Sequence, residues 1–310
     1  MLTTSTNNQT EPNPLAKELG EFYPFKSHYK NVNGHRMHYV DEGSGPVIIM
    51  VHGNPSWSIY WRKLVEELKS KYRVIAIDHI GCGLSDKPSD YNFTLEQRIE
   101  DAWNLVEQLE LKQYSLFVHD WGGAIGMGLA EKAPANVQSL VVFNSAAFFS
   151  SNIPKRIAMC RWPVFGKLAI QGFNAFAGAA VHMATHKGFS KELRKAYVAP
   201  YNSFKNRRAT FEFVQDIPME AGHPTRPTLN KVEEGLSQFI DHPMLIIWGE
   251  KDWCFDISFL KTWKSKFPKA TVLPLRDSGH YVVEDGFDDY IGSLKQFLRQ
   301  SIPAASEPKN

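Results

Sequence analysis

Cysteine is scarce in this sequence, which has three cysteines among 310 residues, Cys82, Cys160 and Cys254. Three scattered cysteines provide neither a disulfide framework nor a zinc-ligand spacing, so we expect a reducing compartment. Long apolar runs are also missing, because a run such as 47–51 is far shorter than the ~20 residues of a membrane-spanning helix. The first twenty residues are polar and lack the apolar core of a signal peptide. The sequence therefore predicts a cytoplasmic protein.

A dominant charge of one sign is absent as well, since 35 Lys and Arg balance 33 Asp and Glu to give a net charge of +2. This balance gives no global signal for nucleic acid, and the 43% hydrophobic and 22% charged fractions exclude collagen-like, coiled-coil and wholly disordered chains. The charge is nevertheless uneven. Residues 155–208 hold eleven basic residues and one acid, Glu192, which gives 11 − 1 = +10. This basic stretch is either a solvated surface or a contact zone for a partner, a membrane surface or an anionic ligand.

Short apolar segments alternate with helical stretches along most of the chain. A hairpin is expected around Asn33-Gly34, a pair typical of tight turns between strands. Further strands are expected at 47–51, 74–77, 116–118, 140–143, 244–248 and 271–275. This alternation predicts an α/β fold with a mostly parallel central sheet and helices on both faces.

The alternation stops in one long stretch that is helical and aromatic. We expect residues 148–235 to form a helical cap inserted into a single core domain made of 21–147 and 236–300. Such an insertion would lie over the carboxyl ends of the strands, where open sheets bind their ligands. Residues 1–20 are predicted to be a disordered or loosely docked arm, and residues 301–310 a flexible tail.

A strand-to-helix turn carries the strongest candidate for chemistry. The segment Val-His-Asp-Trp-Gly-Gly at 118–123 has the layout of a nucleophile elbow, with Asp120 at its apex. A carboxylate is ionised at neutral pH, so it needs no base before it attacks an electrophilic carbon that bears a leaving group. The product is an ester on Asp120 that water must then cleave. The alternative is that Asp120 only caps the helix.

The loop His-Gly-Asn-Pro-Ser-Trp at 52–57 directly follows an expected strand and faces that turn. Backbone N–H groups of the loop, with that of Trp121, can form an oxyanion hole. The Asn54 amide and the Trp121 indole are neutral donors, and such donors can hold a departing anion without a permanent salt bridge. Because Asn-Pro is a common turn pair, a purely structural role for Asn54 stays open.

Two loops late in the chain offer a base and an acid. His280 follows the last expected strand, and its neutral form is available near pH 7 to activate water. Asp252 follows the preceding strand and can orient the imidazole and stabilise its charged form. Glu250 and Asp256 are rivals for this role, and any of the three could merely cap the following helix. Asn144 follows an earlier strand but cannot supply a charge.

These segments resemble the α/β-hydrolase superfamily over nearly the whole chain and, within it, the haloalkane dehalogenases. The resemblance is carried by HGNP at 52–55, DHIGCGLSDKP at 78–88 and HDWGG at 119–123. It implies a nucleophile, a base, an acid and a pair of halide-binding donors, which are respectively Asp120, His280, Asp252, and Asn54 with Trp121. The GxSxG pattern of serine esterases is absent, with Val118 in place of its first glycine.

One subgroup of that family is especially similar. YVAPY at 197–201, QDIP at 215–218 and the acid after the later strand look most like a subgroup that also contains the β-lactone decarboxylases of bacterial long-chain olefin biosynthesis. The resemblance implies that these enzymes share the aspartate nucleophile and the neutral donors. The similarity therefore points to the same site residues for two different substrates.

We predict a haloalkane dehalogenase that hydrolyses carbon–halogen bonds to alcohol and halide through a covalent alkyl-aspartate intermediate. The alternative is a β-lactone decarboxylase that forms a long-chain alkene with the same nucleophile. An epoxide hydrolase, with Tyr197 and Tyr201 as proton donors, is a lesser alternative. A non-enzymatic receptor of the same fold is disfavoured, because a candidate residue is present for every catalytic role.

The expected partners are a small apolar substrate and water, with no nucleic acid, no metal ion and no cofactor. Homo-oligomer formation stays open, as does a contact of the basic cap with a membrane surface or another protein. Six aromatic residues suit an apolar substrate, although such side chains are often plain core. They are Phe148, Phe149, Trp162, Phe165, Phe173 and Phe176.

Overall fold

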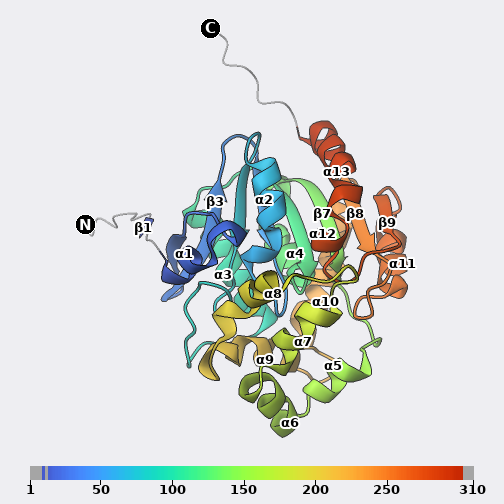
Figure 1. The fold of residues 1–310 in the computed structure, drawn as a ribbon. Coiled ribbons are helices and arrows are strands. Elements are labelled where there is room, and N and C mark those ends of the chain that lie inside the picture. The colour runs from blue at the N-terminus through green and yellow to red at the C-terminus, as the bar shows by residue number, and fades with distance from the viewer. Residues whose placement is uncertain (1–8, 11–12, 303–310) are drawn as a thin grey trace, which may run out of the picture.

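A nine-stranded sheet in the order β1-β2-β3-β5-β4-β6-β7-β8-β9 forms the centre of the protein. The computed structural model describes residues 9–10 and 13–302 (Figure 1). The strands from β5 to β9 in this order are parallel, and β1, β2 and β3 are antiparallel to their neighbours. The strands are β1 (Gln9–Thr10), β2 (His28–Val32), β3 (His35–Glu42), β4 (Val47–Val51), β5 (Arg73–Ile77), β6 (Tyr114–Asp120), β7 (Val137–Ser145), β8 (Met244–Gly249) and β9 (Thr271–Leu275).

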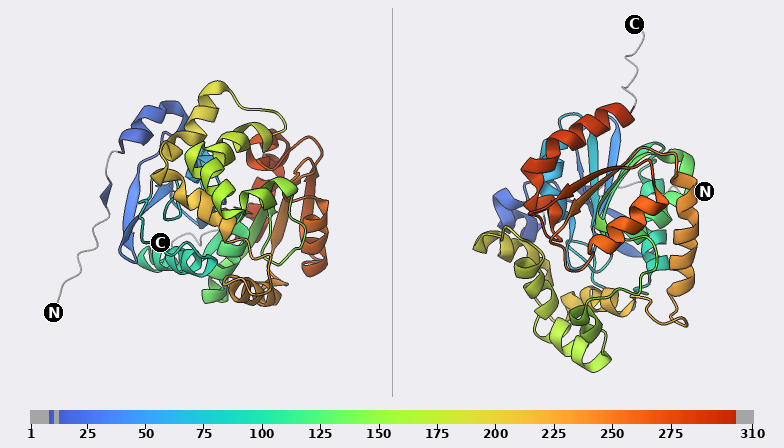
Figure 2. Two further views of the ribbon diagram at one scale, coloured as in Figure 1. Left: turned by 90° about the horizontal axis from the view of Figure 1, so that it is seen from below. Right: turned by 90° about the vertical axis from the view of Figure 1, so that its right-hand side faces the viewer.

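Helices cover both faces of the sheet (Figures 1 and 2). Successive side chains of a strand point to opposite faces, so Ile49 and Val51 of β4 belong to one apolar cluster and Ile48 and Met50 to the other. The first cluster includes helices α3 (Leu95–Gln108), α4 (Gly122–Lys132), α10 (Arg226–Gly235) and α11 (Ile257–Lys266). The second includes helices α1 (Pro14–Leu19), α2 (Arg62–Leu68), α8 (Lys191–Val198), α12 (Val282–Asp285) and α13 (Phe287–Ser301). The predicted mostly parallel sheet with helices on both faces is confirmed.

Local signals account for the boundaries of several elements. Asn33 and Gly34 join β2 to β3 with φ values of 50° and 89°, which is the left-handed backbone that a tight hairpin turn requires. Thr94 caps α3, because its side chain accepts the backbone N–H of Gln97. The hairpin therefore forms where the sequence predicts it, and a side-chain cap defines the start of α3.

The chain between β7 and β8 forms helices and no strand in the part that the structure describes. We call residues 148–235 the cap. Figure 1 shows most of its helices at one end of the sheet, with α6 farthest from the strands, whereas α10 packs on α3 and α4 beside the sheet. Besides α8 and α10, the cap contains α5 (Lys155–Cys160), α6 (Pro163–Lys167), the π-helical turn η4 (Leu168–Gly172), α7 (Ala175–Met183) and α9 (Arg208–Gln215).

The expected N-terminal arm is partly folded. Pro14–Leu19 form helix α1, which Asn13 caps by accepting the backbone N–H groups of Leu15 and Ala16, and Ala16 is buried. Gln9–Thr10 pair with β2. Residues 1–8 and 11–12 of the arm lie outside the described residues. So do residues 303–310 of the expected tail.

Candidate active site

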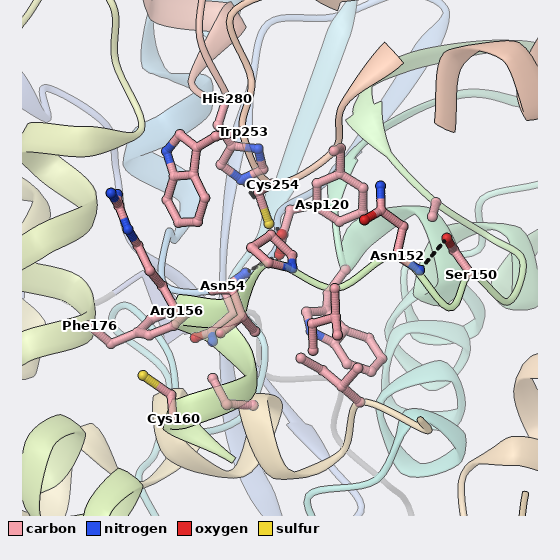
Figure 3. Close-up of a pocket in the computed structure, with 18 of the residues that line it drawn as sticks. Asn54, Asp120, Ser150, Asn152, Arg156, Cys160, Phe176, Trp253, Cys254 and His280 are labelled. Carbon is pink, nitrogen blue, oxygen red and sulfur yellow. Dashed lines mark hydrogen bonds and ion pairs between the residues drawn. The ribbon is translucent and has the colours of Figure 1, made fainter. Parts of the chain in front are cut away.

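Asp120 is the last residue of β6 and lies at a sharp turn into α4. Its φ of 53° is in the left-handed region, which costs energy for a residue with a side chain, and backbone strain of this kind clusters at active sites. The turn is tight, because a Cβ on Gly122 would lie 2.1 Å from the carbonyl oxygen of Val51. The structure thus forms the expected elbow and directs the Asp120 side chain into a cavity under the cap (Figure 3).

The two oxygens of the Asp120 carboxylate have different surroundings. Oδ1 accepts the backbone N–H of Asn54 at 2.6 Å, and the backbone N–H of Trp121 also hydrogen-bonds the carboxylate. Oδ2 lies 3.6 Å from Nε2 of His280. Burial raises the pKa of Asp120, and His280 and the two backbone donors offset this only in part. A carboxylate held by fixed dipoles and little water is well suited to attack a carbon through Oδ2.

His280 lies between Asp120 and Asp252. Its Nδ1–H donates to Oδ2 of Asp252 at 2.8 Å, so Nε2 is the ring nitrogen that faces Asp120. Burial alone would lower the pKa of His280, but the charge and hydrogen bond of Asp252 and the charge of Asp120 outweigh it, and the pKa is raised. A histidine held in this orientation can accept a proton at Nε2 when neutral and stabilise a neighbouring anion when charged.

Asp252 is itself fixed by three donors. Oδ1 accepts the backbone N–H groups of Cys254 at 2.7 Å and Phe255 at 3.1 Å, and Oδ2 accepts the side-chain amide of Asn144 at 2.9 Å. The sequence prediction excluded Asn144 because it carries no charge, whereas the structure gives it a role as a donor. Its position directly after an expected strand was the signal that placed it near the site.

The two rivals of Asp252 lie elsewhere. Glu250 is exposed, and Asp256 caps α11 by accepting the backbone N–H of Ser258 at 2.8 Å. Of the three acids, Asp252 therefore is the one in contact with His280.

Asn54 and Trp121 both line the cavity beside Asp120. One N–H of the Asn54 amide donates to the carbonyl oxygen of Thr210 at 3.1 Å, which leaves its second N–H for a ligand. The Trp121 ring packs against Phe213 with centroids 5.7 Å apart, and no described residue accepts a hydrogen bond from its indole N–H. Four of the five predicted site residues thus line one cavity, and the fifth, Asp252, holds His280 by a hydrogen bond.

The cavity has a volume of about 280 Å³ and is mostly apolar. Its walls come from the core loops and from cap helices α5 and α7, and Figure 3 shows Trp253, Cys254 and Phe176 around the central carboxylate. Arg156 is the one basic side chain in the wall besides His280 within the described structure. Of the six cap aromatics, Phe148, Phe149 and Phe176 line the cavity. The other three, Trp162, Phe165 and Phe173, do not line it and are exposed on the outer surface.

Two neighbours of His280 were missed by sequence reasoning. The ring of Phe255 stacks on that of His280, with centroids 5.6 Å apart and an interplanar angle of 12°. Nε2–H of His119 donates to the carbonyl oxygen of His280 at 2.9 Å. Burial, with the nearby His280, lowers the pKa of His119 well below its usual value, so His119 is a neutral support. Among the residues described, no group of three or more His, Cys, Asp and Glu could hold a metal ion.

Comparison with known proteins shows the family to which the chain belongs. Residues 46–287 match the family model of the alpha/beta hydrolase fold. The structure is similar to the crystal structure of the haloalkane dehalogenase DatA from Agrobacterium tumefaciens, with a TM-score of 0.81 at 23% identity, covering 93% of this chain and 99% of that one. The chain therefore belongs to the α/β-hydrolase family.

Two curated relatives refine this assignment. A cis-3-alkyl-4-alkyloxetan-2-one decarboxylase from Shewanella oneidensis is 42% identical over 296 residues, which is 93% of either chain. Haloalkane dehalogenase 2 from Mycobacterium tuberculosis is 29% identical over 273 residues, covering 86% of this chain and 93% of that protein. Both fit the subgroup that the sequence motifs indicated.

Proposed function

We propose that this protein is a β-lactone decarboxylase that converts a cis-dialkyl oxetan-2-one into an alkene and carbon dioxide. The observation that carries the proposal is the 42% identity over 93% of the chain to a relative of that name, against 29% for a haloalkane dehalogenase. The comparison thus supports the alternative of the sequence analysis better than its first choice. The mostly apolar lining of the cavity around Asp120 suits a ring that carries two alkyl chains.

In the first step, Oδ2 of Asp120 attacks C4, the saturated ring carbon that is bonded to the ring oxygen. The Oδ2–C4 bond forms, the C4–O bond of the lactone breaks, and its electrons go to the departing carboxylate. The amide N–H of Asn54 and the indole N–H of Trp121 donate to that carboxylate. They are neutral, so they stabilise the negative charge without holding it in a lasting ion pair.

In the second step, the bond breaks between the carboxylate carbon and C3, which is the ring carbon that lay between the lactone carbonyl and C4. Its electron pair forms the C3=C4 double bond, carbon dioxide departs, and the C4–Oδ2 bond breaks to regenerate Asp120. Protonated His280, whose Nε2 lies 3.6 Å from Oδ2, stabilises the aspartate as it leaves. Asp252 keeps the imidazole oriented and charged. The reaction consumes no water and no redox partner.

Haloalkane hydrolysis is the second candidate, and the same geometry favours it. Asp120 displaces a halide toward Asn54 and Trp121, leaving an alkyl ester. Neutral His280 then accepts a proton from water, which attacks the ester carbonyl and releases the alcohol. This route differs from decarboxylation in two testable respects, because it requires water and a neutral imidazole.

Epoxide hydrolysis has less support. The two tyrosines considered as proton donors do not line the cavity. Tyr197 donates instead to Glu284 at 2.6 Å, and Tyr201 to the carbonyl oxygen of Ser56 at 3.0 Å.

A parallel assay tests the proposal. The wild-type protein and the Asp120→Asn variant are incubated with a cis-dialkyl β-lactone and with a bromoalkane, and alkene and bromide are measured. We expect alkene from the lactone with wild type and none with the variant. Bromide release without alkene would favour the second candidate, and alkene formation by Asp120→Asn at the wild-type rate would refute the nucleophile.

A further inference from the structure

An apolar surface covers the outer side of the cap. Of the exposed large hydrophobic side chains in the described structure, six fall between positions 159 and 173. They are Met159, Trp162, Val164, Phe165, Leu168 and Phe173, and we call them the apolar cap face. Val164 is 84% exposed, Phe173 76% and Trp162 63%. A cluster of this kind is unusual on a free soluble surface and marks an interaction site.

The face lies on consecutive short helices that project from the molecule. It runs from α5 through α6 and η4, and α6 is the part of the cap farthest from the sheet in Figure 1. The rings of Trp162 and Phe165 contact each other edge to face, with centroids 6.4 Å apart. The exposed apolar side chains thus form one patch and are not scattered singly over the surface.

Hydropathy points to lipid as the occupant. No single described helix is long and apolar enough to cross a bilayer, but Pro163–Gly172 and Ala175–Met183 meet that test as a pair, with a bend of 71° between them. Residues 163–183 contain one Lys, Lys167, and no Asp, Glu or Arg. Ile170 is fully buried against Phe211 and Val214, so one side of the segment packs on the cap. This geometry suits a segment that lies in a membrane interface with its outer side inserted.

The charge around the apolar cap face is positive. Lys155 begins α5, Lys167 ends α6, and Lys205 follows Phe204, whose carbonyl oxygen accepts the side-chain amide of Gln171 in η4. All three lysines are exposed, and in the part of the chain that the structure describes none forms an ion pair with a carboxylate. An anionic surface is complementary to this rim, whereas a second copy would bring like charges together.

Helix α5 of the apolar cap face and the following helix α7 form part of the cavity wall. Ile157 and Cys160 of α5 and Phe176 of α7 line the cavity, while Met159 of α5 points outward. A surface seated in lipid would therefore place the cavity next to the phase in which long-chain substrates dissolve.

We propose that the apolar cap face and its lysine rim dock the protein onto an anionic lipid bilayer, with the apolar side chains inserted at the headgroup level. The protein lies on the membrane and does not span it. The docking rests on surface residues alone and holds whichever reaction Asp120 performs.

Vesicle binding tests this proposal with the full-length protein. Phosphatidylcholine vesicles with and without phosphatidylglycerol are sedimented at low and high salt, and the bound fraction gives the affinity. We expect tight binding to the anionic vesicles that weakens with salt. Absence of binding to anionic vesicles at low salt would overturn the proposal.

Two sets of variants separate the apolar and electrostatic contributions. The double variant Val164→Ser and Phe173→Ser should weaken binding at least about tenfold, because two inserted apolar side chains are lost. Exchanging lysine for glutamine at 155, 167 and 205 should weaken binding to anionic vesicles by about fivefold per residue and leave the weak binding to neutral ones unchanged. The matched control is Ile240→Ser, an exposed apolar residue outside the cap, which should bind as wild type.

Two further readouts report on the fold and on self-association of the double serine variant. Turnover of a water-soluble short-chain substrate should be the same in wild type and in this variant, which shows that the fold is intact. Light scattering gives the molar mass of both proteins. A wild-type dimer that the serine exchanges convert to monomer, or unchanged vesicle binding in the serine variant, would overturn the proposal.

Discussion

Replacing Gly53 with alanine tests how closely the loop after β4 holds the Asp120 carboxylate. A Cβ at position 53 would lie 2.0 Å from Oδ1 of Asp120, and real Cβ atoms essentially never come closer than 3.0 Å, so one partner must move by 3.0 − 2.0 = 1.0 Å. That movement also strains the 2.6 Å hydrogen bond from the Asn54 N–H to Oδ1. A displacement of this size in a reacting group costs about 10²-fold in rate, equivalent to about 2.7 kcal/mol of barrier.

The assay is steady-state turnover of the β-lactone with Gly53→Ala, together with thermal unfolding. The matched control is Gly292→Ala, because a Cβ at Gly292 in α13 meets no atom within 4 Å. This control should keep full turnover and gain up to about 1 kcal/mol of stability from helix propensity. A folded Gly53→Ala protein with wild-type turnover would refute the close packing of loop and nucleophile.

Three further predictions concern the base, the pH dependence and the stability of the cap contact. With a bromoalkane, His280→Ala should trap the alkyl ester, seen as a mass increase on the peptide that contains Asp120; an unmodified peptide after bromide release would contradict the two-step route. Because Asp252 and Asp120 raise the pKa of His280, its neutral form is lost as the pH falls through that raised pKa, so bromide release should decline there while alkene formation from the lactone persists; equal pH profiles would contradict the separate roles of neutral and charged imidazole. Arg98, whose side chain is fully buried, donates to Asp216 at 3.3 Å, so Arg98→Met should lower the free energy of unfolding by about 3–5 kcal/mol, and an unchanged denaturant midpoint would refute the importance of this pair.

The arrangement of the site residues followed from the sequence because of one property of parallel sheets. The carboxyl ends of parallel strands in one sheet lie at the same edge, so residues at or just after the ends of β4, β6, β8 and β9 are brought to that edge. Asp120, Asn54 and His280 could therefore be brought to one place from apolar runs and turn residues alone. The hairpin at Asn33-Gly34 was predictable for a similar local reason.

Other features depend on distances that local sequence does not determine. Asp252 and Asp256 are four residues apart in one loop, and only the path of that loop decides that the first meets His280 and the second caps α11. The role of Asn144 was not predicted because that position was considered only as a source of charge, whereas its amide donates a hydrogen bond to Asp252.

In the cap, even less of the side-chain arrangement could be predicted from the local sequence. Phe173 directly follows the five-residue turn η4, and Phe176 lies in the nine-residue helix α7. Both elements are too short for an apolar periodicity to define a buried side. The sequence could therefore not separate Phe176, which lines the cavity, from Phe173, which is exposed on the outer surface.

The covalent role of Asp120 is the central claim, and a single-turnover experiment tests it most directly. Enzyme in excess is mixed with the cis-dialkyl β-lactone, quenched with acid during the reaction and digested for mass spectrometry. Attack by Oδ2 on the ring carbon predicts that the peptide containing Asp120 gains the mass of the intact lactone and then loses it as alkene appears. Alkene formation with an unmodified Asp120 at every time point, or with the added mass on another residue, would contradict the account.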